Sequence, residues 1–140
     1  MEEHFRLSDS EFLQQFKDCS LSPRIFSHEA HLRLAWLNIQ LDGMSTAEKG
    51  IQEQIEKFVA HVGAKDKYHK TLTIAAIKAV GHFMEKSSAD NFRSFITANP
   101  ELKKDFKSLI NSHYSFDIFS SEEARKSFIE PDVVPFDRLS

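Results

Sequence analysis

The sequence predicts an all-α protein, and three observations support that prediction. Glycine and proline number only four each in 140 residues, too few for a domain of many short strands and tight turns. Helix-start signals recur along the chain, and apolar residues recur at three- and four-residue steps. No internal repeat, low-complexity run or interdomain linker divides the sequence. We therefore expect one domain over residues 1–140, a compact helical bundle with an extended C-terminal tail.

Seven helices are predicted from capping signals and periodicity. Capping boxes, in which a serine accepts from a free backbone N–H and a glutamate reaches back, are matched at three places: Ser8–Glu11, Ser45–Glu48 and Ser120–Glu123. Asn99 and Pro100 indicate an N-cap followed by proline, and Gly43 and Gly63 follow two predicted helix ends. The predicted ranges are 9–18, 28–41, 46–62, 67–86, 89–98, 100–113 and 121–129.

Two of these helices have the composition of central elements. The helix at 28–41 is apolar nearly all round, and the helix at 67–86 carries small residues that permit close packing, among them Ala75, Ala76 and Ala79. The helix at 46–62 is amphipathic instead, with one apolar face. We expect the first two to be covered on most sides.

The chain after residue 114 has a different character. A short helix at 121–129 precedes a segment in which Pro131 and Pro135 prevent further helix. Val133, Val134 and Phe136 give this tail apolar side chains. We expect residues 114–140 to pack either on the bundle or on a partner subunit.

Charge and hydropathy exclude several classes of protein. The chain has 18 basic and 21 acidic residues and a net charge of −3, which gives no electrostatic footprint for nucleic acid or an anionic membrane. No run approaches the roughly 20 apolar residues of a membrane span, and the N-terminus lacks the features of a signal peptide. A single cysteine, Cys19, forms no intrachain disulfide. These features predict a cytoplasmic protein.

A set of histidines is the strongest indication of a functional site in the sequence. His28 and His31 lie three residues apart and share one face of the helix at 28–41. His69 lies in the first turn of the helix at 67–86, with Asp66 three residues before it and Thr73 four after it. Two imidazoles from one helix and a third from its neighbour are a ligand set for zinc, iron or nickel that leaves a position open for water or substrate.

Four further side chains are candidates to bind a ligand beside those histidines. Arg33 has the planar geometry that holds a carboxylate or phosphate, Trp36 has the size to line a pocket, and Tyr68 has a hydroxyl donor next to His69. Thr73 shares a face with His69. Structural roles explain the same residues: a salt bridge for Arg33, core packing for Trp36, and a hydrogen bond to a buried carbonyl for His31.

Three segments of the sequence resemble one protein family. The segments FSHEAHLRLAWL, KYHKTLTIAAI and SSEEARKSFIEPDVVPF are similar to a family of small bacterial helical proteins that pairs Phe-x-His-x-x-His-Leu-Arg-x-Ala-Trp with Tyr-His-x-Thr-x-Thr and ends near Glu-Pro-Asp. The resemblance implies a bacterial cytoplasmic protein and no particular activity. Val133 stands where the family has leucine. The matching residues are His28, His31, Leu32, Arg33, Trp36, Tyr68, His69, Thr71 and Thr73.

Two hypotheses about function follow from the sequence. In the first, His28, His31 and His69 bind a divalent transition metal or a small anionic ligand in a pocket between the helices at 28–41 and 67–86. In the second, the protein is a non-enzymatic interaction or regulatory module, homodimeric, with structural histidines. Catalytic residues are not identified, because the sequence contains no His-Glu-x-x-His, Gly-x-Ser-x-Gly or glycine-rich phosphate loop.

Overall fold

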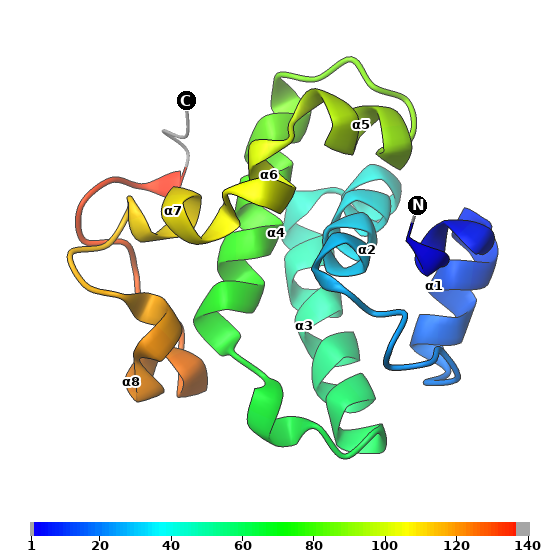
Figure 1. Ribbon diagram of the computed structural model, residues 1–140, viewed down its shortest axis with the longest axis horizontal. Helices are drawn as coiled ribbons and strands as arrows, with labels where there is room; N and C mark the ends of the chain where they lie inside the picture. Colours follow the sequence, from blue (N-terminus) through cyan, green and yellow to red (C-terminus); the bar gives the residue numbers. More distant parts are fainter. Residues whose placement is uncertain (1, 137–140) are drawn as a thin grey trace. The chain divides into compact units, whose positions relative to one another are not determined.

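A computed structural model describes residues 2–136, which form eight α-helices, three 3-10 helices and no strand (Figure 1). This confirms the predicted all-α class. The α-helices are α1 (Asp9–Lys17), α2 (His28–Asp42), α3 (Met44–His61), α4 (Lys70–Glu85), α5 (Phe92–Ala98), α6 (Glu101–Lys104), α7 (Phe106–Asn111) and α8 (Glu122–Lys126). The 3-10 helices are η1 (Glu3–Arg6), η2 (Lys65–Lys67) and η3 (Ile118–Ser120). Within residues 2–136, every helix is too short or too polar to cross a membrane.

The helices belong to two compact units, Met1–Tyr68 and His69–Ser140. The first unit contains η1, α1, α2, α3 and η2, and the second contains α4 to α8 with η3. The expectation of one domain over residues 1–140 stays a prediction.

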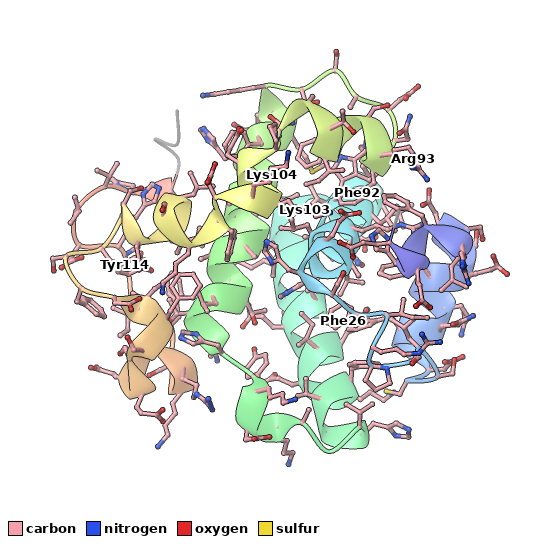
Figure 2. All side chains as sticks on the ribbon, viewed as in Figure 1. Phe26, Phe92, Arg93, Lys103, Lys104 and Tyr114 are labelled. Carbon is pink, nitrogen blue, oxygen red and sulfur yellow. The ribbon has the colours of Figure 1, made fainter. Side chains whose placement is uncertain are left out.

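The first unit is built on α2, which packs along α3, while α1 packs against α3 as well. As expected for a central helix, α2 buries most of its length, from Ala30 to Leu37 with His31 half-buried. Three phenylalanine rings join α1, α3 and the segment before α2, where Figure 2 labels Phe26. The ring centroids of Phe16 and Phe26, and of Phe16 and Phe58, are 4.9 Å apart, and those of Phe26 and Phe58 are 5.4 Å apart. Aromatic pairs at these distances stabilise a core beyond their buried area.

In the second unit, α4 packs against α8 and η3, and side chains hold the chain that follows α8. The Thr71 hydroxyl of α4 donates to the Ser127 carbonyl at 2.9 Å and accepts from the Ile129 N–H at 3.1 Å. The Tyr114 hydroxyl, labelled in Figure 2 beyond α7, donates to the Ile129 carbonyl at 2.6 Å. Residues 127–136, the C-terminal arm, therefore pack on their own unit. The last four residues of the predicted tail lie outside the described residues.

Several predicted helix boundaries differ from the structure, and local interactions or backbone angles explain three of them. The helix predicted at 67–86 begins at Lys70, because the His69 side chain caps it and residues 65–67 form the separate η2. The helix predicted at 100–113 breaks at Asp105, whose φ of −122° and ψ of 26° lie outside the helical region. The helix predicted at 121–129 ends at Lys126, and the Thr71 hydroxyl binds the backbone beyond it.

The capping predictions have mixed outcomes. The box formed by Ser8 and Glu11 is present in full, and Gly43 and Gly63 have positive φ angles of 81° and 73° after their helices, as expected. The other three predicted caps are wrong. The helix α3 begins directly after Gly43 with no side-chain cap, Ser121 rather than Ser120 caps α8, and the Asn99 amide donates to the Phe95 carbonyl instead of capping α6.

Candidate metal centre

A buried histidine of η1 contacts the first turn of α2. The Ser27 hydroxyl caps α2 by accepting from the Ala30 N–H at 3.2 Å, which places Glu29 in the first turn, where a negative charge is favourable. His4 is fully buried, and its Nε2 lies 2.9 Å from Glu29 Oε1. Glu29 itself is only 4% exposed. The local caps and the 3-10 turn thus bring together two polar groups that are 25 residues apart.

Glu2 completes a cluster of three metal-ligating side chains. His4 Nε2 lies 3.9 Å from Glu2 Oε1, and one ligand atom from each of Glu2, His4 and Glu29 lies within 4.8 Å of the other two. The Ser27 hydroxyl, which caps α2, also donates to Glu2 Oε1. Two carboxylates and one imidazole are therefore gathered where η1 meets α2.

Arg33 of α2 holds the N-terminal segment beside this cluster. Its Nη1 donates to the His4 carbonyl at 2.6 Å, and its Nη2 donates to the Leu7 carbonyl at 3.0 Å. Nη2 also lies 2.8 Å from Asp9 Oδ1, and the guanidinium carbon lies 4.7 Å from the centre of the Phe12 ring. Arg33 is thus engaged with its own chain. Its predicted role in ligand binding stays a prediction.

Burial of His4 favours a neutral imidazole in the cluster. Burial lowers the pKa of His4, and the positive charge of Arg33 lowers this pKa further. The hydrogen bond and negative charge of Glu29 act in the opposite direction, as does the smaller effect of the Glu2 charge, and the net effect is still a lowered pKa. The neutral ring is the form that binds metal ions. Two carboxylates face it, and the nearby Arg33 guanidinium is also paired with Asp9.

The two predicted histidine ligands of α2 have different surroundings. His28 is exposed, and His31 is half-buried with its ring centre 5.5 Å from that of Phe26. His31 Nε2 is buried and has no hydrogen-bond partner among residues 2–136. Burial, with a smaller contribution from the charge of His28, lowers the pKa of His31 to about 4. The carbonyl bond expected for His31 in the structural alternative is therefore not made by its Nε2.

The third predicted ligand, His69, uses both ring nitrogens within the second unit. Its Nδ1 accepts from the Leu72 N–H at 3.1 Å, and its Nε2 donates to the Ile118 carbonyl at 2.9 Å. Burial lowers the pKa of His69, and the bond to Ile118 partly offsets this effect. His28 and His31 belong to the first unit, so a centre formed by all three histidines stays a prediction.

The remaining candidates are placed as follows. Trp36 is buried in α2, and Tyr68 is half-buried directly after η2. The Thr73 hydroxyl donates to the His69 carbonyl at 2.8 Å, one turn earlier in the chain. Asn38, two turns after His31 on the same face of α2, donates to the Leu34 carbonyl within that helix. The ligand-binding roles of Trp36, Tyr68 and Thr73 stay predictions.

Sequence reasoning missed the pairing of Glu2 and His4 with Glu29. His4 precedes the first predicted helix at 9–18, and the only local signal is a Glu-x-His spacing that also occurs by chance. No protein-family model, curated protein or solved structure matches this chain.

Proposed function

We propose that this protein binds one divalent metal ion through Glu2, His4 and Glu29. The observation that carries the proposal is the mutual approach of the three ligand atoms to within 4.8 Å. Ligands about 2.1 Å from a tetrahedral ion lie about 3.4 Å from one another. The His4–Glu29 distance of 2.9 Å and the His4–Glu2 distance of 3.9 Å bracket that value, so small side-chain movements suffice.

The chemistry of the cluster supports a metal ion. Two carboxylates balance the charge of a divalent cation, and an uncharged imidazole supplies the third ligand. The proton that links His4 Nε2 to Glu29 is the one that a metal ion displaces on binding. Zinc and iron accept mixed carboxylate and imidazole ligands, and three protein ligands leave room for water. The proposal concerns binding and assigns no reaction.

The test is metal binding by the full chain without a polyhistidine tag. Elemental analysis and calorimetry with Zn²⁺ should give one ion per chain. His4→Gln and Glu29→Gln should each lower the affinity by at least a hundredfold, because each removes a buried ligand. Glu2→Gln should lower it less, since Glu2 is the most exposed of the three.

Three control variants decide between the ligand sets. His61→Gln alters an exposed histidine at the end of α3 and should leave the affinity unchanged. His28→Gln and His31→Gln should also leave it unchanged. Loss of binding in these two variants, with binding retained in His4→Gln, would overturn the proposal in favour of the ligand set predicted from the sequence. The homodimer and the small anionic ligand stay predictions.

A further inference from the structure

Arg33 controls the position of His4 through the backbone of the N-terminal segment. Its guanidinium donates to the carbonyls of His4 and Leu7, 2.6 and 3.0 Å away, and pairs with Asp9. Arg33 is only 4% exposed. A planar guanidinium with several donors in a fixed fork restrains those groups more tightly than a single ammonium would. Arg33 therefore restrains the backbone that carries the His4 side chain.

The same guanidinium lies beside the ring nitrogen that faces away from the cluster. Arg33 Nη1 is 3.4 Å from His4 Nδ1, while His4 Nε2 faces Glu29. When a neutral imidazole binds a metal through Nε2, its proton resides on Nδ1. Histidines that bind metals usually donate that proton to a carboxylate or a carbonyl, which makes the ring a stronger ligand. Here the Nδ1 proton would face a donor and a positive charge.

We infer that Arg33 is a positioning residue that also lowers the ratio of Zn²⁺ affinity to Mn²⁺ affinity at the centre, because it holds a guanidinium donor against His4 Nδ1. This inference rests on the proposed metal site. Zinc gains much from imidazole, whereas manganese is bound mainly by carboxylate and other oxygen ligands. Weakening the imidazole therefore costs zinc more than manganese. Direct repulsion between the guanidinium and a divalent ion is the same for both metals and cancels in the affinity ratio.

A purely structural role for Arg33 makes a different prediction. If Arg33 only restrains the backbone of His4, its removal misplaces the ligand and lowers the affinity for both metals together. If it also acts on the imidazole, its removal changes the ratio of the two affinities. The ratio thus separates the two roles, whatever happens to the absolute affinities.

The experiment measures dissociation constants for Zn²⁺ and Mn²⁺ in the full-length wild type, Arg33→Lys and Arg33→Met. In Arg33→Met the ratio of zinc to manganese affinity should rise about tenfold, the scale on which partners of a ligating histidine act. Arg33→Lys loses the fork but keeps the charge, so its ratio should stay closer to that of the wild type. An unchanged ratio in Arg33→Met would overturn the inference. Absence of binding by the wild type would instead defeat the proposed function.

A second measurement needs no variant and so does not depend on the folding of Arg33→Met. The ¹⁵N chemical shifts of the His4 ring in the metal-free wild type report which nitrogen carries the proton. The inference expects the proton on Nε2, where it is donated to Glu29, because Nδ1 faces the Arg33 donor. A proton found on Nδ1 would contradict the inference even if the affinity ratio could not be measured.

Discussion

The hydrogen-bonded histidines of the two units, buried or half-buried, have different kinds of partner. In the first unit, His4 contacts the carboxylate of Glu29 and the guanidinium of Arg33. In the second unit, His69 contacts the Ile118 carbonyl and His113 contacts the Val134 carbonyl. A carbonyl partner fixes the ring and adds no negative charge, whereas a carboxylate adds both a charge and a second ligand atom. The difference teaches that burial alone does not mark a histidine as a metal ligand.

The same contrast extends to the two ends of the described chain. Charged side chains hold the N-terminal segment on α2, chiefly Glu29 and Arg33. Neutral hydroxyls of Thr71 and Tyr114 hold the first part of the C-terminal arm, and farther along the arm the Asp132 carboxylate accepts from the Ser115 N–H at 2.9 Å. We therefore expect the N-terminal attachment to respond to metal ions and pH, and the hydroxyl bonds of Thr71 and Tyr114 to respond to neither.

The largest expected loss of stability follows from breaking the hydroxyl bonds that hold the C-terminal arm. Thr71→Val keeps the side-chain shape and removes both hydrogen bonds to the C-terminal arm, at Ser127 and Ile129. Because each of the two hydrogen bonds contributes about 0.5–1.5 kcal/mol, the free energy of unfolding should fall by up to about 3 kcal/mol. Urea denaturation measures this change. Thr97→Val, which removes an exposed hydroxyl bond within α5, should cost less than about 0.5 kcal/mol.

Metal addition should stabilise the attachment of the N-terminal segment, with a slightly smaller change in the free energy of unfolding. Zn²⁺ at about a hundred times its dissociation constant should raise the free energy of unfolding of the wild type by about 2.7 kcal/mol. Thr71→Val should show the same increase, because its defect lies in the other unit. Glu29→Gln, whose affinity is at least a hundredfold lower, should gain less than about 0.5 kcal/mol. An increase that disappears in Thr71→Val but persists in Glu29→Gln would mean that the metal ion stabilises the second unit and not the first.

The elements that the sequence predicts well are those whose signals are local. The box of Ser8 and Glu11 involves residues three apart, and the helical face shared by His28 and His31 follows from the helix repeat alone. The end of α8 at Lys126 is different. It accompanies hydrogen bonds from Thr71, more than 50 residues earlier, which no local pattern contains.

The candidate metal centre was missed for the same physical reason. His4 and Glu29 are joined across 25 residues by the turn after α1 and the cap at Ser27. Nothing in the spacing of the two residues specifies that approach. Glu29 lies in the first turn of α2, where the helix N-terminus alone is enough to explain a negative charge. The sequence supplies the residue types of the centre, and only the packing of η1 on α2 shows that they meet.

Acid should weaken the first unit through His31. The pKa of His31 is lowered from 6.5 to about 4 in the folded chain, so the unfolded chain binds a proton that the folded chain does not between these values. The resulting stability is present above pH 6.5 and is lost as the pH falls toward 4. Between pH 7 and pH 5 the free energy of unfolding should fall by about 1–2 kcal/mol more in the wild type than in His31→Gln.

Chemical denaturation of both proteins at the two pH values measures that difference. The wild-type loss also contains the effect of His4, whose pKa is lowered too, and the comparison with His31→Gln removes it. His61→Gln should lose as much stability as the wild type. Equal losses in the wild type and His31→Gln would mean that His31 titrates alike in the folded and unfolded chains.

The smallest expected effect tests the second unit, where His69 caps α4 and binds a carbonyl. Both variants lose the imidazole bond to the Ile118 carbonyl. His69→Asn keeps a side-chain acceptor for the Leu72 N–H, and His69→Ala removes that acceptor as well. The free energy of unfolding of His69→Ala should therefore be lower than that of His69→Asn by about 1 kcal/mol, the usual contribution of an N-cap. Thermal and urea denaturation measure the difference, and calorimetry with Zn²⁺ supplies the control. Both variants should bind zinc like the wild type. If both lose zinc while His4→Gln retains it, the histidine of the second unit is a ligand, and the contrast between carboxylate and carbonyl partners does not decide where the metal binds.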